Sequence, residues 1–181
     1  MTDLSNSDGN APESNGQGGD APQQPRAQGL PIVINVQYLK DLSFENPNAP
    51  QSLIPTGGQP PKIDLAVDVQ ARGLGDNSAE VVLALKAEAT QGDRTAFIAE
   101  VVYAGVISFP AQLPQDTARA LLLIEGPRLL FPFARQILAT AVQQGGFPPL
   151  MLQPIDFVDI YRKQVLGQGQ PSAADAAQGN A

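Results

Sequence analysis

The side chains that most enzymes use for nucleophilic or metal-based catalysis are missing from this 181-residue sequence. It contains no histidine and no cysteine, which excludes Ser-His-Asp and Cys-His catalysis, the usual zinc sites and disulfides. A carboxylate pair or an all-oxygen metal site would be the remaining route to catalysis. Asp64 and Asp68 are candidates, but they alternate with apolar residues, as acids do on the solvent-exposed face of a strand. We therefore expect no enzyme and no bound cofactor or metal.

A different kind of chemistry, the binding of apolar partners, is suggested by residues 145–156, GGFPPLMLQPID. This stretch has five large apolar residues, three prolines and no charge before Asp156. Its prolines exclude a helix interior or a central strand, and irregular loops normally run over the surface. Either the loop is folded onto the core, or it lines a surface that contacts something apolar.

The elements that position this loop begin with four segments of alternating apolar residues, 32–44, 63–72, 80–90 and 94–107, which predict four strands. Short turns join the last three, so they should form an antiparallel meander. The connection ENPNAPQSLIPTGGQPPK after the first strand has five prolines in 18 residues. We expect an ordered crossover there, which lets the first strand join the sheet elsewhere.

Two helices should follow the strands. The first has Pro127 near its first turn and stops at Gly145–Gly146. Pro132 lies inside the helical pattern, so this helix either starts after it or is kinked there. The second helix follows Pro154, has Asp156 near its positive end, where an acid is favoured, and ends near Gly167.

Two of these elements have more apolar surface than one protomer needs. The second helix has two offset apolar stripes, whereas packing on a single sheet requires one. The fourth strand is apolar on both faces: one side has Ala96, Ile98 and Val102, and the other has Phe97, Ala99, Val101 and Tyr103. Because such a surplus is unfavourable in water, we expect self-association.

The two ends differ from the middle of the chain. Residues 1–29 and 167–181 are polar and nearly devoid of large apolar side chains, so both should be disordered tails flanking one domain at 30–166. With 18 acids and 11 bases the net charge is −7, which argues against nucleic acid or anionic membranes as partners. The acidic start is unlike a signal peptide, and no apolar run is long enough to insert into a membrane. We expect a cytoplasmic protein.

Three motifs occurring in order resemble the SecB family of protein-export chaperones: YLKDLSFENPNAP (38–50), LFPFAR (130–135) and GGFPPLMLQPIDF (145–157). The likeness extends over roughly residues 34–165. Two departures are visible, namely a long N-terminal tail and Ala99 at a position where the family has cysteine. The resemblance implies an α+β fold, with a four-stranded antiparallel sheet, a long crossover after the first strand and two C-terminal helices packed on one face.

The resemblance also implies a homotetramer, a dimer of dimers in which sheets join edge to edge and the first helices lie between the sheets. Such a protein holds unfolded precursor proteins without ATP, keeps them competent for translocation, and delivers them to the SecA motor. The alternative is a SecB-like interaction module, such as an antitoxin-associated chaperone, that is not dedicated to export.

Site residues follow from the same resemblance. The SecA docking face corresponds to residues of the first and fourth strands: Asp41, Glu45, Ile98 and Glu100. The client groove corresponds to the crossover, the helix-connecting loop and the second helix: Leu53, Ile54, Phe147, Leu150, Met151, Leu152, Val158, Tyr161 and Val165. The tetramer interface is expected on the fourth strand and first helix: Phe97, Ala99, Val101, Tyr103, Phe133 and Ile137.

Overall fold

The computed structural model describes residues 32–54 and 60–168, and for residues 165–168 it describes the backbone alone. The elements are β1 (Val33–Glu45), the short 3₁₀ helix η1 (Gln51–Leu53), β2 (Lys62–Gly75), β3 (Ser78–Gln91), β4 (Arg94–Ser108), α1 (Gln115–Gln144) and α2 (Phe157–Gln168). The expected tails lie outside the described residues, except that α2 continues to Gln168. Residues 55–59 of the crossover also lie outside them.

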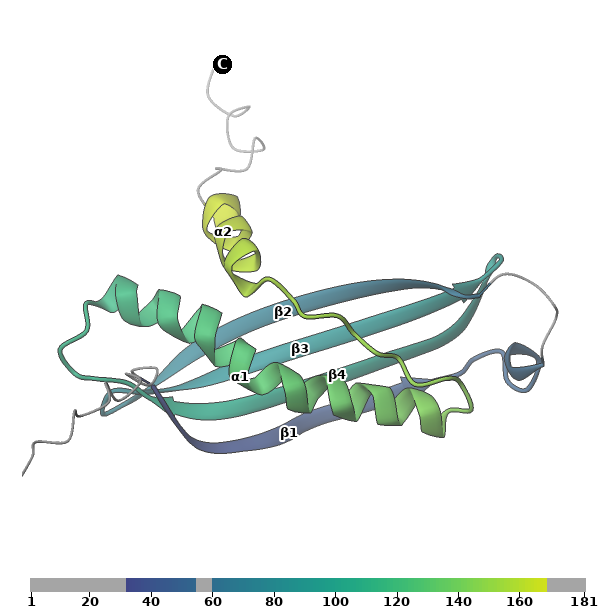
Figure 1. Ribbon diagram of the computed structural model, residues 1–181, viewed down its shortest axis with the longest axis horizontal. Coiled ribbons are helices and arrows are strands. Elements are labelled where there is room, and N and C mark those ends of the chain that lie inside the picture. Colours follow the sequence, from purple (N-terminus) through teal and green to yellow (C-terminus); the bar gives the residue numbers. More distant parts are fainter. Residues whose placement is uncertain (1–31, 55–59, 169–181) are drawn as a thin grey trace, which may run out of the picture.

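The strands form one antiparallel sheet in the order β1-β4-β3-β2 (Figure 1). Strands β2, β3 and β4 form the predicted meander, and β1 joins the sheet beside β4 and not beside β2, which confirms the meander and the placement of the first strand elsewhere in the sheet. Asp76 and Asn77 connect β2 to β3 with positive φ angles of 48° and 56°. This left-handed conformation matches the twist of a tight hairpin and suits Asp and Asn.

The predicted start of the first helix at Pro127 is wrong, because α1 begins at Gln115 and contains both Pro127 and Pro132. A proline inside a helix removes a hydrogen bond and normally destabilises it by about 3 kcal/mol. Here that cost is offset by packing, because Pro127 is fully buried and Gly126 lies directly on the sheet. A Cβ at Gly126 would lie 3.1 Å from Val81 Cγ1, so a larger residue would force Val81 to shift.

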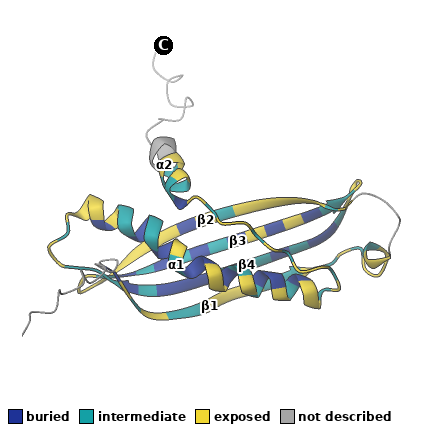
Figure 2. Ribbon diagram, viewed as in Figure 1, coloured by how far each residue is buried: buried dark blue, intermediate teal, exposed yellow. Residues whose placement is uncertain are grey.

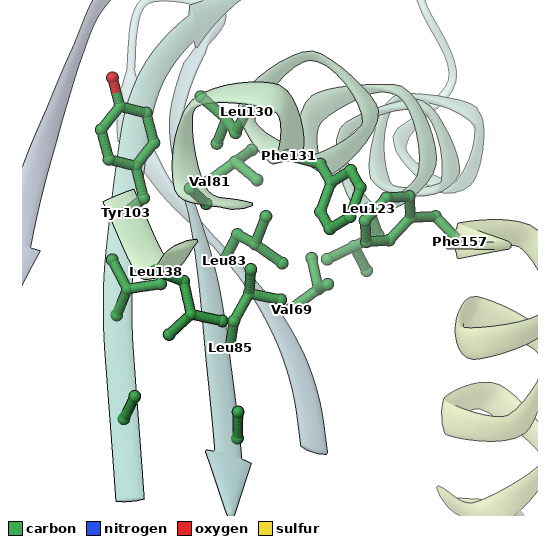
Figure 3. Close-up of a cluster of buried hydrophobic side chains, with 14 of the residues drawn as sticks. Val69, Val81, Leu83, Leu85, Tyr103, Leu123, Leu130, Phe131, Leu138 and Phe157 are labelled. Carbon is green, nitrogen blue, oxygen red and sulfur yellow. The ribbon is translucent and has the colours of Figure 1, made fainter. Parts of the chain in front are cut away.

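The core lies between α1 and the two central strands. Figure 2 shows burial concentrated on β3 and β4, whereas the edge strands β1 and β2 are largely exposed. In Figure 3, Leu83 and Leu85 of β3 point toward Leu130 and Leu138 of α1, and all four are 0 % exposed. This cluster fixes α1 on one face of the sheet, called here the inner face. The opposite face is called the outer face.

Four residues of β4 that were predicted to form the tetramer interface instead belong to this core. Phe97, Ala99, Val101 and Tyr103 lie on the inner face, and each is at most 8 % exposed within one protomer. Both faces of β4 are apolar, so the alternation of its residues could not show which face meets α1. The pairing of Val101 with Leu85 and of Tyr103 with Leu83 places this set on the inner face.

α2 begins as predicted. Asp156 Oδ1 accepts hydrogen bonds from the backbone N–H groups of Val158 at 2.9 Å and Asp159 at 3.2 Å, an N-cap that satisfies two otherwise free donors. Phe157 is 1 % exposed and meets Phe131 edge to face, with ring centroids 6.0 Å apart. α2 therefore packs chiefly on α1 (Figure 1). It also contacts the sheet, because Gln164 Nε2 donates a hydrogen bond to the carbonyl oxygen of Val69 in β2 at 3.4 Å.

Candidate functional site

The segment between α1 and α2 returns across the sheet from the end of α1 to the start of α2 (Figure 1). An aromatic cluster anchors its first turn: the ring of Phe147 lies 4.9 Å from that of Phe97 and 6.4 Å from that of Phe44. Gly145 makes this possible, because a Cβ there would lie 2.0 Å from Phe44 Cζ. The loop is therefore held in place at its start.

The crossover after β1 meets the same loop. Leu53 lies against Gly146, where a Cβ would be 3.1 Å from Leu53 Cδ2. Asn48 Nδ2 donates a hydrogen bond to the carbonyl oxygen of Thr95 at 2.8 Å, which fixes the start of the crossover to β4. These contacts place the crossover and the helix-connecting loop side by side, with apolar side chains on both.

The predicted groove residues divide into two groups by exposure. Leu53, Ile54 and Met151 are 41 %, 58 % and 68 % exposed. The others are only partly exposed, and most of them pack against the core: Phe147, Leu150, Leu152, Val158 and Tyr161. The side chain of Val165 lies outside those that the structure describes. The loop therefore does two things. One side of it packs on the core, and Met151 on the loop stays exposed.

The four residues predicted for motor docking lie together on the outer face of β1 and β4. Glu45 is directly opposite Ile98, Ser43 is opposite Glu100, and Asp41 is opposite Val102. Asp41 and Glu45 are exposed, and Ile98 and Glu100 are partly exposed. Among the described residues, none of these three acids forms an ion pair. The result is an acidic face in which Ile98 lies at one end, opposite Glu45.

The other acids considered at first have ordinary surroundings. Asp64 forms an ion pair with Lys62 at 3.0 Å, and Asp68 accepts a hydrogen bond from Gln70 at 2.8 Å. Both carboxylates are exposed on β2. Asp64 and Asp68 therefore look like solvated strand acids.

A second apolar surface lies where β1 meets α1. It is called here the β1–α1 strip and consists of Leu39, Leu42, Phe133 and Ile137. Leu39, Leu42 and Phe133 are 44 %, 43 % and 46 % exposed, and Phe133 stacks on Tyr103 with ring centroids 6.2 Å apart. Leu42 and Ile137 line a hollow of about 460 Å³. Of the predicted interface residues, Phe133 and Ile137 belong to this strip.

Leu39 and Leu42 were missed by sequence reasoning. Both leucines were visible within the strand, but Leu39 shares a face with Leu42 only because of the β-bulge between Leu39 and Asp41. A bulge inserts one residue and changes the phase of the alternation.

Within the described residues, no helix is long and apolar enough to cross a membrane.

Comparisons with known proteins agree with this architecture. The sequence model of the family described as "Preprotein translocase subunit SecB" matches residues 23–168. The protein-export protein SecB of Rhodospirillum centenum is 65 % identical over 150 residues, which cover 83 % of this chain and 89 % of the relative. The protein-export protein SecB of Parvibaculum lavamentivorans is 44 % identical over 180 residues, which cover 99 % of this chain and 100 % of the relative.

Among solved structures, the SecB-like chaperone of Mycobacterium tuberculosis, in complex with a ChAD peptide from the HigA1 antitoxin, has a TM-score of 0.57. The two sequences are 16 % identical, and the matched region covers 68 % of this chain and 90 % of the M. tuberculosis chain. At this identity the likeness supports the fold alone. With the family match spanning nearly all the described residues and the relatives covered almost end to end, the chain belongs to the SecB family of protein-export chaperones.

Proposed function

We propose that this protein is an ATP-independent export chaperone that binds unfolded precursor proteins along the surface formed by the crossover, the helix-connecting loop and α2. The observation that carries this proposal is the arrangement of Leu53, Ile54 and Met151, which remain exposed beside an anchored apolar loop. Unfolded chains expose apolar side chains, and a rigid apolar surface binds them without first having to order itself.

The first test removes exposed apolar side chains from this surface. Ile54→Ser combined with Met151→Ser should weaken binding of an unfolded precursor by at least about tenfold, because two large apolar contacts are lost. The free energy of unfolding should change by less than about 0.5 kcal/mol per site, as is usual for exposed positions. Calorimetric titration and thermal unfolding measure the two quantities on the same samples.

Leu74→Ser is the matched control, because Leu74 is 47 % exposed but lies at the end of β2, in the β2–β3 hairpin. Leu150→Ser and Leu152→Ser should lower both stability and affinity, since both side chains pack against the core. Client binding that is equally weakened by Leu74→Ser, or unaffected by the double substitution, would place the client elsewhere.

The acidic face is proposed to dock the SecA motor. Asp41, Glu45 and Glu100 are free of ion pairs within the described residues, and Ile98 lies beside Glu45 and Glu100 at one end of the face. This arrangement suits a partner surface that carries basic side chains next to an apolar one. It lies on the outer face, whereas the proposed client surface lies on the inner side. A chaperone with this layout can hold a client and contact the motor at once.

Neutralising the acidic face tests this role. Asp41→Asn, Glu45→Gln and Glu100→Gln together should weaken SecA binding by about tenfold, since each exposed charge contributes some tenths of a kcal/mol. Raised salt should weaken wild-type binding in the same way. The control changes three other exposed acids, Asp64→Asn, Asp68→Asn and Asp93→Asn, and so has the same net charge. Equal loss in both triple variants, measured by surface plasmon resonance, would show that overall charge and not this face attracts the motor.

Assembly into a homotetramer is proposed on the basis of the β1–α1 strip and of β1 itself, which is an edge strand with one side unpaired in the protomer. An unpaired edge beside exposed apolar residues is a surface that folded proteins normally cover. No observation on this chain favours the alternative of an antitoxin-associated chaperone.

A further inference from the structure

β1 is paired with β4 through two β-bulges, which change the face that its middle residues occupy. Ile34 is opposite Ile107 and Asp41 is opposite Val102, so seven steps along β1 match five along β4. The two additional residues are Asn35 and Lys40, at the two bulges. If the pairing continued from Asp41 toward the start of β1 without a bulge, Leu39 and Gln37 would lie on the outer face. Because of the bulge at Lys40, residues 36–39 are turned over, and Leu39 and Gln37 lie on the inner face.

The cost of this phase is visible at Gln37. It lies opposite Gly105 on the inner face, and its Oε1 atom is buried without a hydrogen-bond partner among the described residues. Val36 meanwhile lies on the outer face and is 50 % exposed. A buried polar atom without a partner is unfavourable. Regular pairing without bulges would turn Gln37 outward and Val36 inward, which removes both costs, but it would turn Leu39 outward and Lys40 inward.

A polar cluster on the outer face opposes a slip of β1 into this regular pairing, called here the slipped register. Lys40 Nζ donates a hydrogen bond to Glu80 Oε1 at 2.8 Å, and Tyr38 Oη donates to the same oxygen. These hydrogen bonds, with that from Lys40 contributing most, hold the pKa of Glu80 below its ordinary value, so the carboxylate stays charged. Glu80 belongs to β3, so both side chains reach it across β4. In the slipped register Tyr38 and Lys40 would point to the inner face and lose their hydrogen bonds to Glu80.

We infer that Glu80 is a positioning residue that holds residues 36–39 of β1 in the bulged register and thereby turns Leu39 into the β1–α1 strip. The inference rests on the proposed assembly only for the role of Leu39. The C-terminal part of β1 has its own anchor, because Phe44 stacks on Phe97 with ring centroids 5.8 Å apart. Asp41 and Glu45 therefore keep their face in either register.

The test compares Glu80→Ala with Glu88→Ala, which removes the same charge from the exposed outer face of the same strand. Glu80→Ala should accelerate amide hydrogen exchange of residues 34–40 by about tenfold, since hydrogen bonds to a charged group are lost. Residues 42–45 should exchange as before. Glu88→Ala should leave both segments unchanged. Equal exchange of residues 34–40 in the two variants would overturn the inference.

A second substitution provides rescue. Gln37→Leu places an apolar side chain at the inner position and removes the buried oxygen, so it should favour the bulged register. Adding Gln37→Leu to Glu80→Ala should return the exchange of residues 34–40 to within about twofold of wild type, whereas no rescue would overturn the register explanation. Light scattering on the same variants separates the two proposals: altered exchange with unchanged assembly contradicts the role of Leu39 in assembly and leaves the positioning role of Glu80 intact.

Discussion

Replacing Phe157 by alanine should release α2 from the protomer while the sheet and α1 stay folded. Phe157 is 1 % exposed and lies against Phe131 at the point where α2 begins. Truncating a fully buried phenylalanine typically costs about 3–5 kcal/mol. α2 packs chiefly on α1, so this cost should fall mainly on the local equilibrium that undocks α2. Its amides should then lose protection from hydrogen exchange by at least about a hundredfold.

The comparison that makes this result specific is between α2 and β3. Amides of Leu83 and Leu85, in the centre of the core, should keep their protection to within a small factor. Val158→Ala is the matched control on the same helix, because Val158 is only partly buried. Client affinity should also fall in Phe157→Ala, since Val158 and Tyr161 are displaced with the helix. Equal loss of protection in β3 and α2 would instead show that α2 unfolds only together with the whole protomer.

The sheet was predictable because the second and third strands alternate clearly between apolar and polar residues, and the fourth is a long apolar segment between turn residues. The turn at Asp76–Asn77 and the proline-rich crossover then determined which strands follow each other in space. The start of α1 was not predictable from local preference. Pro127 is unfavourable within a helix, and only its burial against the sheet, together with the close approach of Gly126 to Val81, makes the long helix stable.

The residues of the outer face were easier to predict from the sequence than those of the inner face. The acidic residues Asp41 and Glu45 were correctly placed on one face together with Glu100, because the residues after the second bulge alternate regularly. The face of β4 that meets α1 could not be chosen from the sequence, since both faces are apolar; Phe97, Ala99, Val101 and Tyr103 are buried within the protomer. The importance of Glu80 was invisible, because its partners Tyr38 and Lys40 come from a strand that is not its neighbour.

The helix-connecting loop shows a further limit of sequence reasoning. A proline-rich apolar loop can pack on the core or expose its side chains, and the residues 145–156 do both. Small packing details decide between the two, such as the absence of a Cβ at Gly145, which lets the ring of Phe44 approach the backbone. Contacts of this kind join residues that are far apart in sequence, so no local pattern can reveal them.

A charge placed in the β1–α1 strip should dissociate the proposed tetramer without unfolding the protomer. Phe133 is 46 % exposed in the single protomer and loses only its stacking on Tyr103, so Phe133→Asp should cost the fold less than the about 3–5 kcal/mol typical of truncating a buried phenylalanine. In an interface between copies the aspartate would be buried without a partner. The effective penalty for such a charge is several kcal/mol, which corresponds to a dissociation constant raised by about a thousandfold or more.

Light scattering over a range of protein concentrations measures this directly. Wild type should remain a tetramer at micromolar concentration, and Phe133→Asp should give a smaller species with the same circular dichroism spectrum. Leu74→Asp is the control, because it introduces the same charge at a residue that is 47 % exposed in the β2–β3 hairpin and outside the strip. The physical basis is the asymmetry between the two sites: water solvates a new carboxylate at Leu74 in every assembly state, but at Phe133 only when the copies are apart. A Phe133→Asp protein of unchanged size, or a wild type that is a stable monomer, would exclude the strip as the assembly surface.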